Sequence, residues 1–208
     1  MRKFQKIDKT STNMKKKQTY KSNISAIYTD ASIKNKQMGI GIWSSDENIA
    51  ISRRIDGYTD INRAELVAIF CSLLYTRKTI PSNKIILTDS ITSIKSIKGD
   101  VYCDKFSNIT EYIQIILSNW DGYVRFQKVK GHSGDIGNNE ADKLAGNSIL
   151  VPNTKMFIIP DFINYENIVD MDKYFDYLYQ LNFLDTKYAI ASNGCSYELE
   201  EFPPTLFI

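Results

Sequence analysis

Four acidic residues stand where predicted strands end or predicted helices begin, which is where the active sites of open α/β sheets gather. Asp30 and Asp89 end short apolar runs that predict strands, Glu65 lies early in a predicted helix, and Asp142 lies one turn into another. Carboxylates brought to one sheet edge repel one another unless cations neutralise them, and their oxygens favour Mg²⁺ or Mn²⁺ over zinc. Two such ions about 4 Å apart suit phosphodiester hydrolysis, one activating water and the other stabilising the leaving oxygen.

The chain has one histidine, His132, in a Gly-His-Ser-Gly loop at residues 131–134. A lone histidine is more often structural than functional. Here, however, the flanking glycines allow the loop to move, and an imidazole ordinarily titrates near neutrality. We therefore expect His132 to transfer protons during hydrolysis.

The hydrophobic pattern along the chain predicts the elements that position these residues. Apolar and polar residues alternate, or form short apolar runs, where strands are expected, and apolar residues recur at helical spacing where helices are expected. The predicted order is β-β-β-α-β-α-α-β-α, which implies an α/β fold with a mixed five-stranded sheet, three antiparallel strands followed by parallel ones, flanked by helices. The expected strands cover residues 24–30, 39–43, 49–53, 84–89 and 122–130, and the glycines of the second strand suggest close backbone packing. The expected helices cover about 64–74, 108–118 and 138–147, together with a short helix that Ser90 caps and that holds Ile94 and Ile97.

Four segments, in order and at suitable intervals, carry a resemblance to a known family. Residues 23–148 resemble the type 1 ribonuclease H family, and the last of the four segments, a Gly-His-Ser-Gly loop followed by Asn and then Asp, is the most specific. The segments are residues 28–32 (YTDAS), 62–66 (NRAEL), 87–90 (LTDS) and 129–145 (VKGHSGDIGNNEADKLA).

The resemblance implies a ribonuclease H fold and an endonuclease that cuts the RNA strand of RNA–DNA hybrids, leaving 5′-phosphate and 3′-hydroxyl ends. His132 would assist proton transfer or product release. Asn138 either caps the last core helix or supports the loop before it, and we expect the cap. The implied ligands of two Mg²⁺ ions, with Mn²⁺ as an alternative, are Asp30, Glu65, Asp89 and Asp142; the implied contacts to the hybrid, largely in its minor groove, involve Ser32, Asn62, Ser90 and Asn138.

The sequence departs from the family's pattern at several positions. Ala31 replaces the glycine that usually follows the first aspartate, and Ile61 replaces a polar residue before the Arg-x-Glu segment. Asp60 lies close to where some members bind a DNA phosphate, which it would repel. The segment between Ile97 and Gly122 lacks the basic, Trp-rich protrusion that some members use to hold substrate.

Charge divides the chain into three expected parts. Residues 1–22 carry eight Lys/Arg and one acid, which predicts a disordered basic arm. This arm could bind phosphates, serve nuclear import or only keep the protein in solution. Residues 23–150 form the expected ribonuclease H domain. Residues 151–208 carry three Lys and nine acids, and their Tyr-rich stretch at 171–184 predicts a helix that packs on the core.

The composition indicates in which cellular compartment the protein is expected. No apolar run approaches the roughly 20 residues that cross a bilayer, and no apolar stretch follows the charged N-terminus. Cys71, Cys103 and Cys195 are far apart and form no Cys-x-x-Cys pair, so reduced thiols are expected rather than a zinc site. We expect an intracellular monomer, in cytoplasm or nucleus, with no membrane partner.

Three other functions remain open at this stage. The chain could be a non-catalytic relative that binds nucleic acid, the ribonuclease H part of a reverse transcriptase or mobile element, or a DNA-cutting resolvase or transposase. The presence of all four acids and His132 argues against the first. The chain holds no polymerase-sized region, and the segment at 129–145 does not resemble the DNA-cutting relatives.

Overall fold

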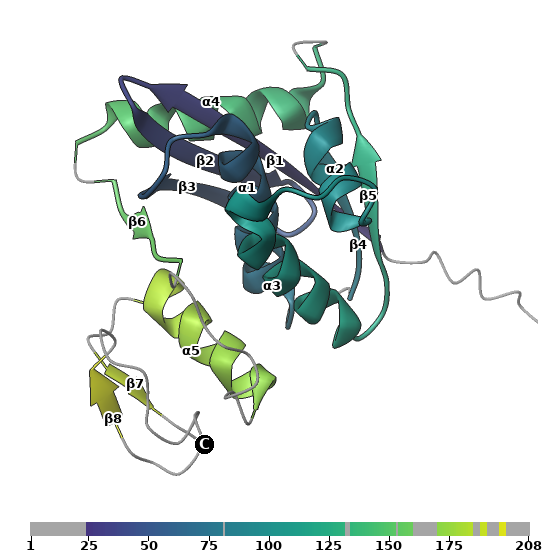
Figure 1. Cartoon of the computed structure of the whole chain (residues 1–208), viewed down its shortest axis with the longest axis vertical. Coiled ribbons are helices and arrows are strands. Elements are labelled where there is room, and N and C mark those ends of the chain that lie inside the picture. Colours follow the sequence, from purple (N-terminus) through teal and green to yellow (C-terminus); the bar gives the residue numbers. More distant parts are fainter. Residues whose placement is uncertain are drawn as a thin grey trace, which may run out of the picture.

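The structure is a computed structural model, and it describes residues 24–80, 82–131, 134–152, 154–159, 170–184, 188–190 and 196–198. Among these, a mixed sheet is flanked by helices (Figure 1). The strands are β1 (Ile24–Lys34), β2 (Gln37–Ser44), β3 (Ile49–Ile55), β4 (Asn83–Thr88), β5 (Val124–Lys128) and β6 (Met156–Phe157), with β7 (Tyr188–Ile190) and β8 (Ser196–Glu198) in a separate pair. The helices are α1 (Ile61–Thr76), α2 (Ile91–Ile97), α3 (Ser107–Ser118), α4 (Ile136–Leu150) and α5 (Met171–Phe183), with a 3-10 turn, η1 (Asp104–Phe106), before α3.

The sheet order is β5-β4-β1-β2-β3-β6. β1, β2 and β3 pair antiparallel, whereas β4 and β5 run parallel to β1, so the predicted mixed sheet is confirmed. The predicted number of five strands is wrong, because β6 adds to the free edge of β3 in parallel orientation. A two-residue strand is too short for an alternating pattern, and what holds it is the burial of Phe157, which is 2% exposed.

Helix α4 lies directly on strand β2. A Cβ atom built on Gly41 would lie 2.0 Å from the carbonyl oxygen of Ala141 and 2.5 Å from the amide nitrogen of Ala145. The glycines of β2 therefore permit a backbone-to-backbone contact that no side chain would allow. The alternate residues Ile40 and Ile42 point to the opposite face, where they join the core with α1.

Helix α1 is the central element of that second layer. Asp60 caps it, accepting hydrogen bonds from the amides of Asn62 at 2.8 Å and Arg63 at 3.3 Å. Twelve of its sixteen residues are buried, since β1 and β2, α3 and α5 all pack against it. This packing fixes the position of α1, and therefore of Glu65, relative to the sheet.

The C-terminal extension contributes to the same core. As predicted, the Tyr-rich stretch forms a helix, α5, that packs on α1. Tyr174, fully buried, stacks on Tyr112 of α3, and Asn182 bonds both the amide of Ile158 at 2.7 Å and its carbonyl at 3.1 Å. The division of the chain at residues 22 and 150 remains a prediction.

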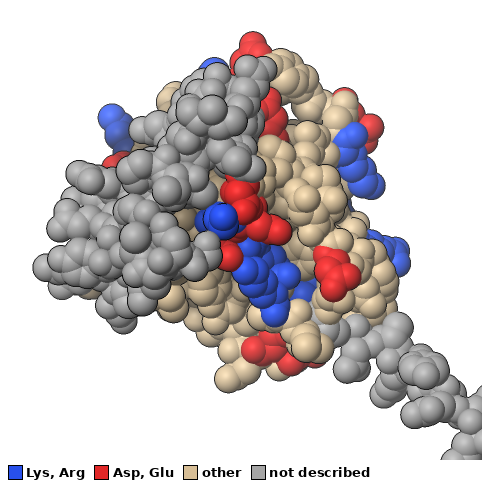
Figure 2. Space-filling view, turned by 90° about the horizontal axis from the view of Figure 1, so that it is seen from below, with Lys and Arg blue, Asp and Glu red and all other residues tan. Residues whose placement is uncertain are grey.

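Ion pairs also join α1 to the extension. Arg77, at the end of α1, bonds Asp172 at 3.2 Å and also pairs with Asp176. Acidic and basic side chains of the described residues lie side by side on the face shown in Figure 2. This face therefore presents mixed charge rather than one uniform patch.

Two further expectations concern the described residues. No helix among them combines the length and the apolar character needed to cross a membrane. Cys71 and Cys103 are free, as expected of reduced thiols, and Cys195 lies outside the described residues.

Candidate active site

Strands β1 and β4 bring Asp30 and Asp89 together. Their parallel pairing ends at Tyr28 opposite Leu87, and continuing this register by two residues places Asp89 beside Asp30. Asp89 directly follows β4, which ends one residue earlier than the sequence predicts, at Thr88. Asp30 does not end its strand, because β1 continues to Lys34 in antiparallel pairing with β2. The long partner strand β2 extends β1 beyond the point where β4 stops.

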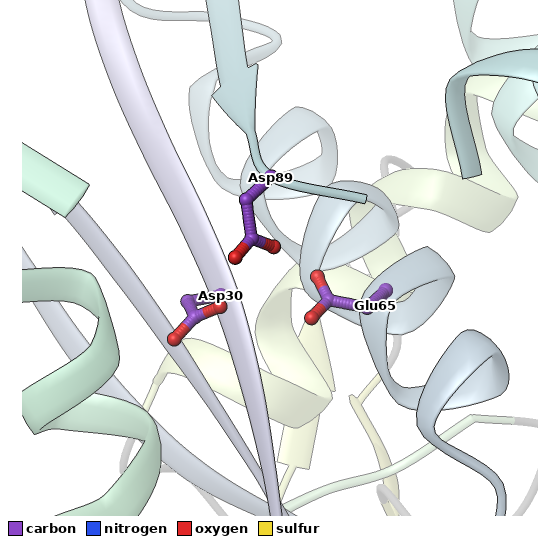
Figure 3. Close-up of side chains that lie close together, drawn as sticks. All are labelled: Asp30, Glu65 and Asp89. Atoms are coloured by element: carbon purple, nitrogen blue, oxygen red, sulfur yellow. The ribbon is translucent and has the colours of Figure 1, made fainter. Parts of the chain in front are cut away.

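Glu65 completes a cluster of three carboxylates. It is the fifth residue of α1, and Asp30, Glu65 and Asp89 each offer an oxygen within 4.8 Å of the others. Figure 3 shows the three side chains converging from β1, α1 and the end of β4. Three of the four acids singled out in the sequence are therefore adjacent in space.

The fourth acid, Asp142, extends from α4 and lies close enough to Asp30 to raise its pKa. It is half-buried and lies almost two turns into α4 rather than one, because the helix begins at Ile136. The expected cap by Asn138 is wrong: Asp135 caps α4, accepting from the amide of Asn138 at 3.0 Å. Asn138 instead lies in the first turn with its side chain buried, and its amide oxygen has no hydrogen-bond partner.

The cluster is electrostatically strained. Burial and, after it, the neighbouring charges of Asp89 and Asp142 together raise the pKa of Asp30 to about 7. Burial also raises the pKa of Glu65 well above its ordinary value, with contributions from Asp30 and Asp89. The Glu65 Oε2 atom is buried without a hydrogen-bond partner. A divalent cation, which prefers carboxylate oxygens, would neutralise the repulsion and satisfy that oxygen.

The loop expected to carry His132 begins against this cluster. A Cβ atom on Gly131 would lie 2.5 Å from Asp89 Oδ2, so the backbone there passes close to the carboxylate. His132 itself lies outside the described residues, and its expected role remains a prediction. The sequence predicts that the glycines beside His132 make the loop mobile. The structure gives Gly131 a different role, because only a residue without a side chain fits so close to the Asp89 carboxylate.

The remaining expected residues line the same end of the sheet. Ser32 is half-buried on β1, two residues beyond Asp30, and Asn62 lies in the first turn of α1. Ser90 caps α2, as predicted, accepting from the amide of Ser93 at 3.2 Å. Asp60, expected to repel a substrate phosphate, is used as the α1 cap, and Ile61 beside it is 44% exposed.

Fold and site together define an α/β protein with a carboxylate cluster at the edge of a mixed sheet, and sequence comparison gives its family. The RNase H family model matches residues 22–149, more than half of the chain, so the protein belongs to the ribonuclease H family. The predicted resemblance is thereby confirmed.

Individual relatives agree with that assignment. Human Ribonuclease H1 is 28% identical over 145 residues, a match covering 61% of this chain and 50% of the human protein. The match thus spans about half the length of this relative.

Solved structures share the fold. The N-terminal RNase H domain of Rv2228c from Mycobacterium tuberculosis, solved as a fusion with maltose-binding protein, is 18% identical with a TM-score of 0.51, covering 61% of this chain and 93% of that one. LC11-RNase H1, isolated from compost by a metagenomic approach and solved in complex with an RNA/DNA hybrid, is 21% identical with a TM-score of 0.51, covering 60% of this chain and 96% of that one.

Proposed function

We propose that the protein hydrolyses the RNA strand of RNA–DNA hybrids in a reaction that depends on Mg²⁺ or Mn²⁺. The observation that carries this proposal is the convergence of Asp30, Glu65 and Asp89 within 4.8 Å, with Asp142 close enough to raise the pKa of Asp30. Membership of the ribonuclease H family supports the choice of reaction. The relative solved with an RNA/DNA hybrid supports the choice of substrate.

The four carboxylates would hold two metal ions. Bound Mg²⁺ would neutralise the cluster, activate the attacking water and stabilise the leaving 3′ oxygen, which gives 5′-phosphate and 3′-hydroxyl products. Asp30, which has both Asp89 and Asp142 as neighbours, would be one of the residues that hold the metal ions. His132 moves a proton or assists product release from its loop.

The substrate would lie across the end of the sheet that carries the cluster. Ser32, Asn62 and Ser90 border this end from β1, α1 and α2. Their small polar side chains suit contacts to 2′-hydroxyl groups, which distinguish the RNA strand in a minor groove. Ser90 Oγ accepts a hydrogen bond from the backbone amide of Ser93 and also lies 2.8 Å from the Ser93 hydroxyl oxygen. A Ser90 side chain that contacts the substrate would therefore also serve as the cap of α2. Asn138, buried in α4, would support this surface from below.

We further propose that the protein acts as a monomer inside the cell, in cytoplasm or nucleus, and that the basic arm at residues 1–22 contributes phosphate contacts. Eight cations on one segment favour salt-dependent binding that is independent of nucleotide sequence.

A gel assay with labelled RNA–DNA hybrid, RNA duplex, DNA duplex and single strands tests the proposal, each with Mg²⁺ and with chelator. Cutting of RNA only in the hybrid, and only with metal, is the expected result. Tight hybrid binding without cutting would instead indicate a binding protein, and cutting of DNA would indicate a resolvase-like nuclease. End-labelling of the products checks the predicted 5′-phosphate.

A further inference from the structure

One row of residues crosses three strands of the sheet where helix α4 packs on it (Figure 1). Gly41 of β2 pairs directly with Asp30 of β1 on one side and with Ser52 of β3 on the other. Residues directly opposite one another in antiparallel strands point to the same face of a sheet. Gly41 lies against α4, so Asp30 and Ser52 also face this helix, one on each side of the glycine.

Gly41 places the backbone of α4 directly on the sheet. A Cβ atom at this position would lie 2.0 Å from the carbonyl oxygen of Ala141, so no side chain can stand between the helix and β2. A contact of this kind allows close approach but resists rotation weakly, because glycine has no side chain that could interlock with the helix. The rotation of α4 about its own axis must therefore be fixed by other contacts.

Ser52 supplies such a contact on the side of β3. Its hydroxyl donates a hydrogen bond of 2.7 Å to the backbone carbonyl of Leu144, in the middle of α4. A hydrogen bond weakens steeply when its angle is distorted. A rotation of α4 that turned the Leu144 carbonyl away from β3 would consequently break the bond.

Asp142 extends from the other side of the same helix. An α-helix turns by about 100° per residue, which places Asp142 about 100° to one side of Ala141 and Leu144 about 60° to the other. Because Leu144 is held on the side of β3, Asp142 lies on the side of β1, where Asp30 is. The raised pKa of Asp30, to which Asp142 contributes, agrees with this placement.

We propose that Ser52 is a positioning residue that fixes the rotation of α4, so that Asp142 lies beside Asp30 and can complete the metal-binding cluster. Ser52 touches neither substrate nor metal and acts only through the helix. The inference deepens the proposed function and rests on it for its catalytic readout, but not for its metal-binding readout.

Two substitutions at Ser52 test the hydroxyl itself. Ser52→Ala removes the hydroxyl and leaves the rest of the side chain in place. Ser52→Thr keeps the hydroxyl on a residue that suits a strand. If the hydroxyl fixes α4, the threonine variant should retain what the alanine variant loses.

The matched control is Ser148→Ala. Ser148 is a fully buried residue of α4, and its hydroxyl also donates to a helix carbonyl, that of Ala145 at 2.6 Å. A Cβ atom built on Gly39 would collide with Ser148 Oγ, so this hydroxyl lies at the same interface between helix and sheet. Its hydrogen bond stays within α4 and cannot fix the helix relative to the sheet.

The experiment measures kcat, KM and the Mg²⁺ concentration for half-maximal hybrid cleavage in the full-length wild type and the three variants, together with melting temperature. A misplacement of about 1 Å can cost roughly 100-fold in rate, and we expect Ser52→Ala to lose about 10-fold in kcat. It should also need more Mg²⁺, with KM for the hybrid little changed. Ser52→Thr and Ser148→Ala should stay within a few-fold of wild type.

Three results of this experiment would overturn the proposal. The first is unchanged cleavage by Ser52→Ala. The second is an equal loss in Ser148→Ala, which would indicate general loosening of the interface. The third is an equal loss in Ser52→Thr, which would indicate that the size of the side chain matters rather than its hydroxyl.

Calorimetric titration of Mn²⁺ without nucleic acid separates this inference from the proposed reaction. Ser52→Ala and Asp142→Asn should each bind Mn²⁺ more weakly than the wild type. Adding Ser52→Ala to Asp142→Asn should cause no further loss, because residues that act through one another are not additive.

The two proposals can therefore fail separately. If the wild type cleaves no hybrid, the proposed function fails, whereas this pattern of Mn²⁺ binding would still support the role of Ser52. Equal Mn²⁺ binding by Ser52→Ala and wild type, additive losses in the double variant, or no binding by the wild type would count against that role.

Discussion

Asp89 is the carboxylate whose removal should affect catalysis with least effect on folding. It is only half-buried and follows β4 rather than lying within the core. Asp89→Asn removes a charge while preserving shape, so we expect cleavage to fall below detection and the melting temperature to remain within a few degrees of wild type. Circular dichroism and the hybrid assay measure both properties, and substantial residual cleavage would contradict its assignment as a metal ligand.

Asp30 should instead make metal-free protein sensitive to pH. Its pKa is raised from 3.8 to about 7, first by burial and then by Asp89 and Asp142. Between those values the folded state holds the proton more tightly than the unfolded chain, so stability is present at low pH and is lost as the pH rises through about 7. Unfolding with chelator across this range should show a decline in melting temperature toward alkaline pH.

The variant Asp30→Asn provides the control for that effect, because an amide cannot ionise. Above pH 7 without metal, the variant should be more stable than wild type, and below pH 3.8 the two should converge. Glu65, whose pKa is also raised, should leave part of the decline in place. If the variant showed the full wild-type pH dependence, Asp30 would not be its source.

At the scale of elements, the contact between α4 and β2 determines where Asp142 lies. Gly41→Ala would place a methyl carbon 2.0 Å from the carbonyl oxygen of Ala141, which is backbone and cannot rotate away. We expect a loss of about 1–3 kcal/mol in the free energy of unfolding, typical of overpacking. Cleavage should also fall, because α4 must move together with Asp142.

Gly146→Ala is the matched control on the same helix. A Cβ atom there meets nothing within 4 Å, and alanine favours a helix by roughly 0.5–1 kcal/mol over glycine. Denaturant unfolding should therefore show stabilisation with unchanged cleavage. Equal behaviour of the two alanine variants would mean that close packing at Gly41 is not required.

At the scale of the whole molecule, the C-terminal extension acts as part of the core. Phe157, Tyr174, Phe175 and Leu178 are each at most 2% exposed, and burying one such side chain contributes roughly 1.5–3 kcal/mol. A chain ending at residue 150 should consequently be insoluble or strongly destabilised, whereas one ending at residue 184 should keep most of its stability. Thermal unfolding of the two truncated chains compares them, and a stable chain ending at residue 150 would contradict this view.

The basic arm should affect binding rather than stability. Deleting residues 1–22 removes eight cations, so affinity for the hybrid should fall and its dependence on salt should become shallower. An arm of equal length with glutamine at its basic positions separates charge from length. An unchanged salt slope in both variants would show that the arm does not contact phosphate.

The sequence by itself determined the central architecture and the acids of the site, because both depend on local signals. Alternating apolar residues or short apolar runs predict β1 to β5, and the short motifs around Asp30, Glu65 and Asp89 identify positions that the sheet then gathers within 4.8 Å. The glycines of β2 predicted close packing, and Ser90 predicted a helix cap, since each depends on the conformation of a few neighbouring residues.

Only the tertiary structure decided features that depend on distant segments. Strand β6 exists because Phe157 enters a core built by other elements. Asp135 caps α4 in place of Asn138 because the helix begins at Ile136, earlier than the sequence predicts. Periodicity and motif spacing report what each segment forms, whereas the partner of a buried polar group is set by how the segments pack.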